Sequence, residues 1–130
     1  MIYIPISIGE LIDKLSILQI KKNKIHDEEK LQHINKEFEL LYNLSAEFLN
    51  DINIEKIYHE LVVTNSSLWE IEDRIRVLEK DQRFEGEFIE IARKVYLTND
   101  RRFDLKNQIN FLTCSEIVEV KDYVDYKNKN

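Results

Sequence analysis

The stretch FEGEFIEIARKVYLTNDRRFDLKNQINFL, residues 84–112, decides the fold of this chain. Its first half carries apolar residues at the three-and-four spacing of an amphipathic helix: Phe88, Ile91, Ala92 and Val95. In its second half the same row fills with polar residues: Asn99, Arg102, Lys106 and Asn110. Apolar residues continue beside that row, which keeps the helical pattern going to about Leu112.

Three explanations fit this polar row. The helix could break at TND, where Thr98, Asn99 or Asp100 would cap a new segment. The row could instead leave the core and face water. Finally, it could face a polar layer or cleft, where Arg102 and Lys106 meet Glu72, another acid or an anionic ligand.

The composition of the whole chain favours a single all-α domain over residues 1–130. Hydrophobic residues make up 43% of the chain and charged residues 34%, which is typical of helices with long solvated faces. Gly occurs twice and Pro once, too few for the many tight turns of a β-sandwich or barrel.

Helix signals divide the region 8–112 into four segments. The motif SIGE at Ser7 predicts a capping box and a helix from about 8 to 25, in which Glu10 reaches back to the Ser7 N–H. Asp27 is expected to cap a second helix to about residue 50, and Asn53 a third to about residue 80. The turn DQRFEG precedes a fourth helix from about Phe84. Short connections predict an antiparallel bundle of about four helices.

The sequence predicts extended structure at both ends of the chain. Residues 1–6 predict an arm, and residues 116–126 alternate as a possible short strand that could pair with it. Residues 127–130 predict a frayed tail. The long apolar stripes also allow coiled-coil packing between chains, so we expect self-association as a homodimer.

A second polar flank lies on the third helix, where Trp69, Glu72 and Arg76 fall together beside the apolar row. In one interpretation Trp69 belongs to the core and Glu72–Arg76 is a boundary ion pair. In the other, this flank lines a pocket. Lys14 lies near the apolar face of the first helix, as a partner of Glu10 or as a snorkelling lysine. The candidate ligand site comprises Lys14, Trp69, Glu72, Arg76, Asn99, Arg102 and Lys106.

Several functional classes are disfavoured. The net charge of −6 argues against a general nucleic-acid or membrane binder. Cys114 is the only cysteine, so neither an internal disulfide nor a cysteine zinc site can form. The chain has no long apolar run, no convincing signal peptide and no cofactor motif, and we expect a cytoplasmic protein without a cofactor.

The rival enzyme interpretation rests on acid pairs. Glu70 and Asp73, and Glu87 and Glu90, stand three apart, and all-α nucleotide phosphohydrolases hold Mg²⁺ with acids of this general kind. Helical phase points Glu70, Asp73 and Glu90 away from the apolar rows, whereas metal ligands of a bundle project inward. The three histidines have no zinc-binding spacing, and nothing around Cys114 resembles a nucleophile motif.

The runs PISIGELIDKLSILQIKK, LWEIEDRIRVLE, FIEIARKVYLTNDRRFDLKNQIN and EIVEVKDYVDY resemble a family of short bacterial helical proteins of unknown function. The resemblance spans Pro5 to Tyr126 and implies one mostly helical domain, without an activity to carry over. The matching residues are Glu10, Asp13, Lys14, Trp69, Glu72, Asp73, Arg76, Arg93, Tyr96, Asn99, Asp100, Arg102, Lys106 and Asn110.

From the sequence we therefore expect a non-catalytic binding or scaffold module with a polar cleft. Its arginines and lysines suit an anionic small molecule or an acidic protein segment. The alternatives are a Mg²⁺-dependent all-α nucleotide phosphohydrolase and a purely structural oligomerisation module.

Overall fold

In a computed structural model, which describes residues 1–127, the chain folds into four α-helices, with no strand in those residues. The helices are α1 (Ile8–Lys24), α2 (Glu28–Leu49), α3 (Ile52–Lys80) and α4 (Glu87–Leu112). This confirms the predicted all-α bundle of about four helices. The predicted tail at 127–130 lies, apart from Lys127, outside the described residues.

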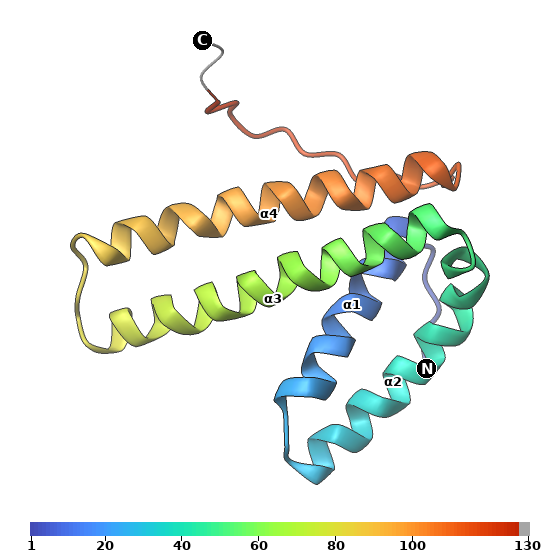
Figure 1. The fold of residues 1–130 in the computed structure, drawn as a ribbon, viewed down its shortest axis with the longest axis horizontal. Coiled ribbons are helices and arrows are strands. Elements are labelled where there is room, and N and C mark those ends of the chain that lie inside the picture. The colour runs from blue at the N-terminus through green and yellow to red at the C-terminus, as the bar shows by residue number, and fades with distance from the viewer. Residues whose placement is uncertain (128–130) are drawn as a thin grey trace.

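The helices form two antiparallel hairpins of unequal length (Figure 1). The α1–α2 hairpin lies across one half of the longer α3–α4 hairpin. At its C-terminal end α1 is tied to α3 by an ion pair of 2.6 Å between Lys24 and Glu70. We call residues 71–98, which extend past this point, the arm, and the rest of the four-helix region the body. Figure 1 shows the arm as two helices without a third beside them.

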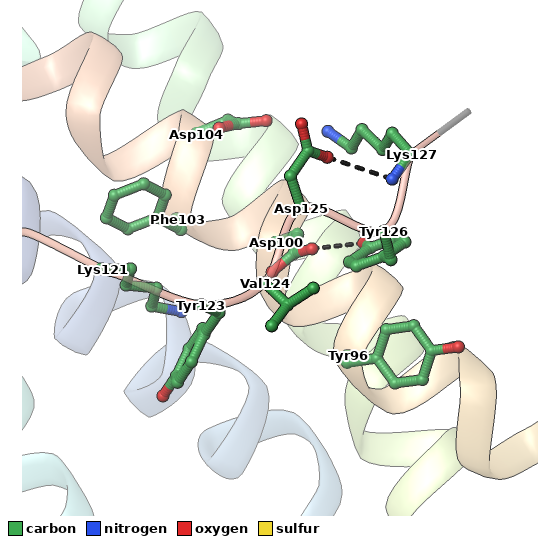
Figure 2. Close-up of a pocket in the computed structure, with 10 residues that line it drawn as sticks. All are labelled: Tyr96, Asp100, Phe103, Asp104, Lys121, Tyr123, Val124, Asp125, Tyr126 and Lys127. Atoms are coloured by element: carbon green, nitrogen blue, oxygen red, sulfur yellow. Dashed lines mark hydrogen bonds between the residues drawn. The ribbon is translucent and has the colours of Figure 1, made fainter. Parts of the chain in front are cut away.

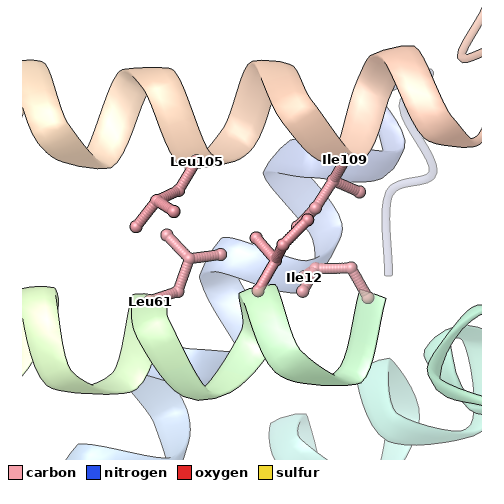
Figure 3. Close-up of a cluster of buried hydrophobic side chains, with 5 residues drawn as sticks. Ile12, Leu61, Leu105 and Ile109 are labelled. Carbon is pink, nitrogen blue, oxygen red and sulfur yellow. The ribbon is translucent and has the colours of Figure 1, made fainter. Parts of the chain in front are cut away.

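The apolar core lies in the body, between α3, α4 and the first turns of α1 (Figure 3). Ile12, Leu61, Leu105 and Ile109 are each 0% exposed and point toward one another, with Ile57 beside them. Full burial of one such side chain stabilises the fold by about 1.5–3 kcal/mol. The core therefore fixes how α1 crosses the hairpin, and with it the positions of the polar side chains of α1.

Caps explain where three of the helices begin. The Ser7 hydroxyl accepts from the Glu10 N–H at 3.1 Å, as the SIGE motif predicts. Glu10 does not complete the box, because its carboxylate bonds Lys106 of α4 instead. Asp27 caps α2 as expected. The predicted cap at Asn53 is wrong: Asp51 is the cap of α3, and its carboxylate accepts from the Asn53 N–H at 2.8 Å.

The fourth helix begins at Glu87, after Gly86 at φ 42°, rather than near Phe84. It then runs unbroken through Thr98, Asn99 and Asp100 to Leu112, so a break at TND is wrong. Glycine accepts a positive φ at little cost, which places the turn before Glu87. Three side chains of the polar row, Arg102, Lys106 and Asn110, find partners on other parts of the chain.

The two ends do not form a sheet. Residues 1–4 are between 69% and 88% exposed, and residues 116–126 form no strand and no ladder with them. The possible pairing of these segments is therefore wrong. The C-terminal segment runs along α4 instead (Figure 1), where Glu119 approaches Lys106 and Tyr126 donates to Asp100. Charged and aromatic contacts with α4 take the place of a backbone ladder.

Within residues 1–127, none of the helices combines the length and the apolar character needed to cross a lipid bilayer.

Candidate functional site

The polar row of α4 is buried or half-buried, and α1 supplies carboxylates that match its charges. Asp13 is 0% exposed and receives two bonds from the Arg102 guanidinium, 2.9 Å from Nε to Oδ1 and 2.5 Å from Nη2 to Oδ2. The hydrogen bond to Asp13 raises the pKa of Arg102, although burial opposes it. This bidentate geometry is the strong form of an ion pair.

Asn65 of α3 joins the same group. Its Nδ2 donates to Asp13 Oδ1 at 2.9 Å and to the Ser16 hydroxyl at 2.8 Å. Ser16 in turn donates to the Asp13 carbonyl at 2.6 Å. The buried carboxylate of Asp13 on α1 therefore has partners on two other helices, α3 and α4. A buried charge of this kind is tolerated only when it is paired and hydrogen-bonded.

Lys106 occupies the next layer of the row. Its ammonium lies 3.0 Å from Glu10 on α1 and 2.6 Å from Glu119 on the C-terminal segment, and the residue is only 7% exposed. Burial lowers the pKa of Lys106, but the hydrogen bonds to Glu119 and Glu10 outweigh it and the pKa is raised. Lys106 thus ties both ends of the chain to α4.

Asn110 completes the row at a close approach of two helices. Its Oδ1 accepts from the Gly9 N–H at 2.7 Å. A Cβ on Gly9 would lie 2.3 Å from the Lys106 carbonyl oxygen, so no larger residue fits without moving α1. Ile8 N–H also donates to the Ser115 hydroxyl at 3.1 Å. The N-terminus of α1 is thereby fixed against the C-terminal end of α4.

A cleft of about 370 Å³ opens where α1 leaves the hairpin, next to Asp13–Arg102. Its size falls in the range of small-molecule sites. Ile17, Ile20 and Leu68 supply apolar side chains. The other residues that line it are Asn65, Trp69, Glu72, Asp73, Arg76 and Arg102.

Four of the seven predicted site residues line this cleft together: Trp69, Glu72, Arg76 and Arg102. Lys14, Asn99 and Lys106 do not line it. Lys14 is exposed, 3.9 Å from Glu10, and Lys106 is used in its two ion pairs. Asn99 is half-buried on α4.

Glu72 does not meet Arg102 or Lys106. It pairs with Arg76 one turn along α3, and the Arg76 side chain is 70% exposed. Of the three explanations for the polar row, the structure shows the polar layer, but with Asp13, Glu10 and Glu119 as the acids.

Sequence reasoning did not place Asp13 or Glu119 in the site. Asp13 shares a helical face with Ser16, Ile17 and Ile20, at positions three, four and seven residues on, and this spacing could have found it. Asp73 was expected to point outward and yet lines the cleft, as an exposed side chain at its rim. The position of Glu119 has no signal in the sequence, because it follows from how the C-terminal segment docks.

That segment forms a second cavity with α4, of about 490 Å³ (Figure 2). Tyr126 donates to Asp100, and its ring meets Tyr96 edge-on at 5.2 Å between centroids. The bond to Asp100 raises the pKa of Tyr126 to about 12. The Lys121 ammonium lies 5.1 Å from the Phe103 ring centroid, a cation–π distance. This cavity is lined by side chains of α4 and the C-terminal segment.

The acid pairs of the enzyme interpretation are engaged elsewhere. Glu70 bonds Lys24 at 2.6 Å, and Glu87 bonds Arg74 through two contacts of 2.5 and 2.7 Å. Glu90 lies 3.6 Å from Arg93. Within residues 1–127 no group of three or more His, Cys, Asp or Glu side chains converges in a way that could hold a metal ion.

Comparison with known protein families adds one finding. A model described as a family of unknown function, DUF6165, matches residues 2–128, almost the whole chain. The chain belongs to the DUF6165 family. No curated protein and no solved structure matches it significantly. For this DUF6165 member, function therefore has to be argued from the cleft and the surfaces of its own fold.

Proposed function

We propose that the chain is a non-catalytic helical binding module whose cleft between α1, α3 and α4 takes a small anionic molecule with an apolar body. The observation that carries the proposal is that two arginines from different helices, Arg76 and Arg102, line one small cleft together with Trp69.

Arg102 is prepared for this role by its pair with Asp13. The bonds to Asp13 come from Nε and Nη2 of Arg102 and hold the guanidinium in place. They do not use Nη1, which remains available to donate to a ligand. The side chain is 25% exposed, which leaves it accessible from the cleft. A preorganised arginine loses less entropy on binding a carboxylate or phosphate than a mobile one.

Arg76 supplies the second cation from the rim. Glu72 neutralises it in the free protein, and both side chains are accessible enough to separate. An incoming anion would replace the Glu72 carboxylate on Arg76. Because Glu72 and Asp73 remain beside the cleft, we expect a singly charged ligand, such as a carboxylate, rather than a polyphosphate.

The apolar side chains select the rest of the ligand. Ile17, Ile20 and Leu68 lie on one side, and Trp69 offers a large ring. Such surfaces favour an aliphatic or aromatic group attached to the anion. A cytoplasmic location is part of this proposal.

The test is a thermal-shift screen with aliphatic and aromatic carboxylates, and with nucleotides as the polyanionic comparison. A ligand present at one hundred times its Kd stabilises the folded state by about 2.7 kcal/mol. We expect a carboxylate to raise the melting temperature of the wild type, and Arg76→Gln to remove that shift. Arg101→Gln, an exposed arginine outside the cleft, is the matched control.

Two results would contradict the proposal. One is the absence of a shift with any compound of the screen. The other is a shift that survives both Arg76→Gln and Trp69→Ala, because the ligand would then bind elsewhere.

A further inference from the structure

The cavity between α4 and the C-terminal segment is separate from the cleft to which the anion is assigned (Figure 2). Its volume of about 490 Å³ lies in the range of small-molecule sites. No residue lines both the cavity and the cleft. One wall of the cavity comes from α4 and the other from residues 121–127, so a ligand here would contact two parts of the chain at once.

Aromatic side chains stand on both walls of the cavity. Tyr96 and Phe103 belong to α4, and Tyr123 and Tyr126 belong to the C-terminal segment. The Tyr96 and Tyr126 rings meet edge-on, with 5.2 Å between their centroids. The face of an aromatic ring carries partial negative charge and attracts cations. The rings therefore favour a ligand with a positive charge and an apolar body.

The charged residues of the cavity favour a cation as well. They are three acids and two bases: Asp100, Asp104, Asp125, Lys121 and Lys127. The difference, three minus two, gives the cavity a net charge of −1 within a chain of −6. The pKa of Tyr126 is raised by its hydrogen bond to Asp100, by desolvation, and by the charges of Asp100 and Asp104. The field of these carboxylates thus reaches the Tyr126 hydroxyl.

The chain already places one of its own cations against the aromatic rings. The Lys121 ammonium lies 5.1 Å from the centroid of the Phe103 ring and 5.9 Å from that of the Tyr123 ring. Both are cation–π distances, and such contacts are weak where they are open to solvent. Lys121 therefore shows which chemical group suits this end of the cavity, and an ammonium from outside can take its place.

The length of the cavity favours a ligand with two ammonium groups. Tyr96 and Phe103 stand seven residues apart, which is about 10 Å along the axis of α4. One ammonium would use only one end of that length. Asp100 lies between the two rings in the sequence, and its carboxylate can accept more bonds than the one from Tyr126.

We propose that the cavity between α4 and residues 121–127 binds an extended aliphatic diamine. One ammonium takes the place of Lys121 against Phe103 and Tyr123, and the other lies near Asp100. The aliphatic chain between them packs against the remaining rings. Because both walls contribute, the bound diamine also ties the C-terminal segment to α4.

Calorimetric titration of the full chain with 1,5-diaminopentane tests the proposal. The comparison compounds are 1-aminopentane, which has one ammonium, and 1,5-pentanediol, which has none. We expect the diamine to bind most tightly, the monoamine to bind roughly fivefold or more weakly, and the diol to give no measurable binding. The screen of the cleft uses carboxylates, so the two proposals fail separately.

Three variants locate the site. Lys121→Met removes the competing ammonium but keeps a long side chain, and should tighten diamine binding roughly fivefold. Asp104→Asn should weaken it roughly fivefold. Its matched control is Asp122→Asn, at an exposed acid of the segment that does not line the cavity.

Phe103→Leu should also weaken binding roughly fivefold, because it removes a ring but keeps an apolar side chain. Its control is Phe111→Leu, at a phenylalanine of α4 that is 84% exposed and lies outside the cavity. Circular dichroism checks that each variant keeps its helices. The proposal is overturned if neither the wild type nor Lys121→Met binds the diamine. It is also overturned if Asp104→Asn and Phe103→Leu bind as tightly as their controls, because the diamine would then bind elsewhere.

Discussion

The two halves of α4 differ in which of their side chains are buried. In the body, Lys106 and Asn110 are 7% and 3% exposed, although both are polar. In the arm, Ile89 and Tyr96 are 54% and 45% exposed, although both are large and apolar. The same helix therefore buries polar side chains in the body, beside the apolar Leu105 and Ile109, and exposes large apolar side chains in the arm.

The neighbours of each half explain this difference. In the body, α1 crosses at close range and brings Asp13 and Glu10 to the cations of α4. The arm has α3 on one side and no third helix of the described chain on the other. Burial along a helix thus follows from what crosses it, and helical phase alone does not determine it.

Removing one partner of the buried pair should have the largest effect. Arg102→Ala leaves the Asp13 carboxylate buried and unpaired, and we expect it to lower the free energy of unfolding by about 3–5 kcal/mol. Urea unfolding measures the change. Arg101→Ala, the exposed neighbour, should stay within about 0.5 kcal/mol of the wild type.

A double substitution shows whether the loss comes from the unpaired charge. Asp13→Leu with Arg102→Met removes both charges and should recover most of the stability. If Arg102→Ala costs no more than Arg101→Ala, the pair does not hold the body together, and the contrast between the halves loses its main support.

The close approach at Gly9 should come next in size. Gly9→Ala forces a Cβ against the Lys106 carbonyl, and overpacking of this kind costs about 1–3 kcal/mol. It should also weaken the bond from the Gly9 N–H to Asn110. Urea unfolding is again the measurement, with Lys14→Ala on the exposed side of α1 as the control. Equal stability of the two variants would show that α1 shifts freely.

Most of the fold could be predicted from the sequence, because helices depend on local signals. The apolar period and the caps Ser7 and Asp27 gave four helices with bounds close to those observed. Two observed helix starts differ from the predicted ones, and the reasons are also local. The Asp51 carboxylate accepts from the Asn53 N–H, and Gly86 forms the turn before Glu87.

The site was only partly predictable, because its contacts join distant segments. Helical phase identified Arg102 and Lys106 as a row that needs acids, and Trp69 and Arg76 as a cleft-lining flank. It did not say that Asp13, 89 residues from Arg102, would be the acid. That pairing depends on how α1 crosses the hairpin, which the core of Ile12, Leu61 and Leu105 sets.

The amide hydrogen-exchange rates of the two halves of α4 should also differ, with a smaller effect than the substitutions above. The amides of residues 103–110 lie under α1 and the C-terminal segment, while those of residues 88–96 open with the two-helix arm. We expect the amides of the arm to exchange roughly tenfold or more faster than those of residues 103–110, measured at low protein concentration. Equal protection along α4 at low concentration would contradict the division into arm and body.

The smallest effect concerns the C-terminal segment, which is tied to α4 at the border of the two halves. The Tyr126 hydroxyl donates to Asp100, and this raises its pKa from 10.0 to about 12. Because the folded pKa is raised, the contact is fully present below pH 10 and is lost as the pH rises through 12. Tyrosinate absorbance should therefore show Tyr126 titrating late in the folded protein, together with Tyr58, whose pKa is raised by burial. Tyr126→Phe should remove one tyrosine from the late component and leave the melting temperature nearly unchanged, whereas Tyr123→Phe, at an exposed position, should leave the late component as it is. A late component of undiminished size in Tyr126→Phe would mean that the segment is not held to α4 by this bond.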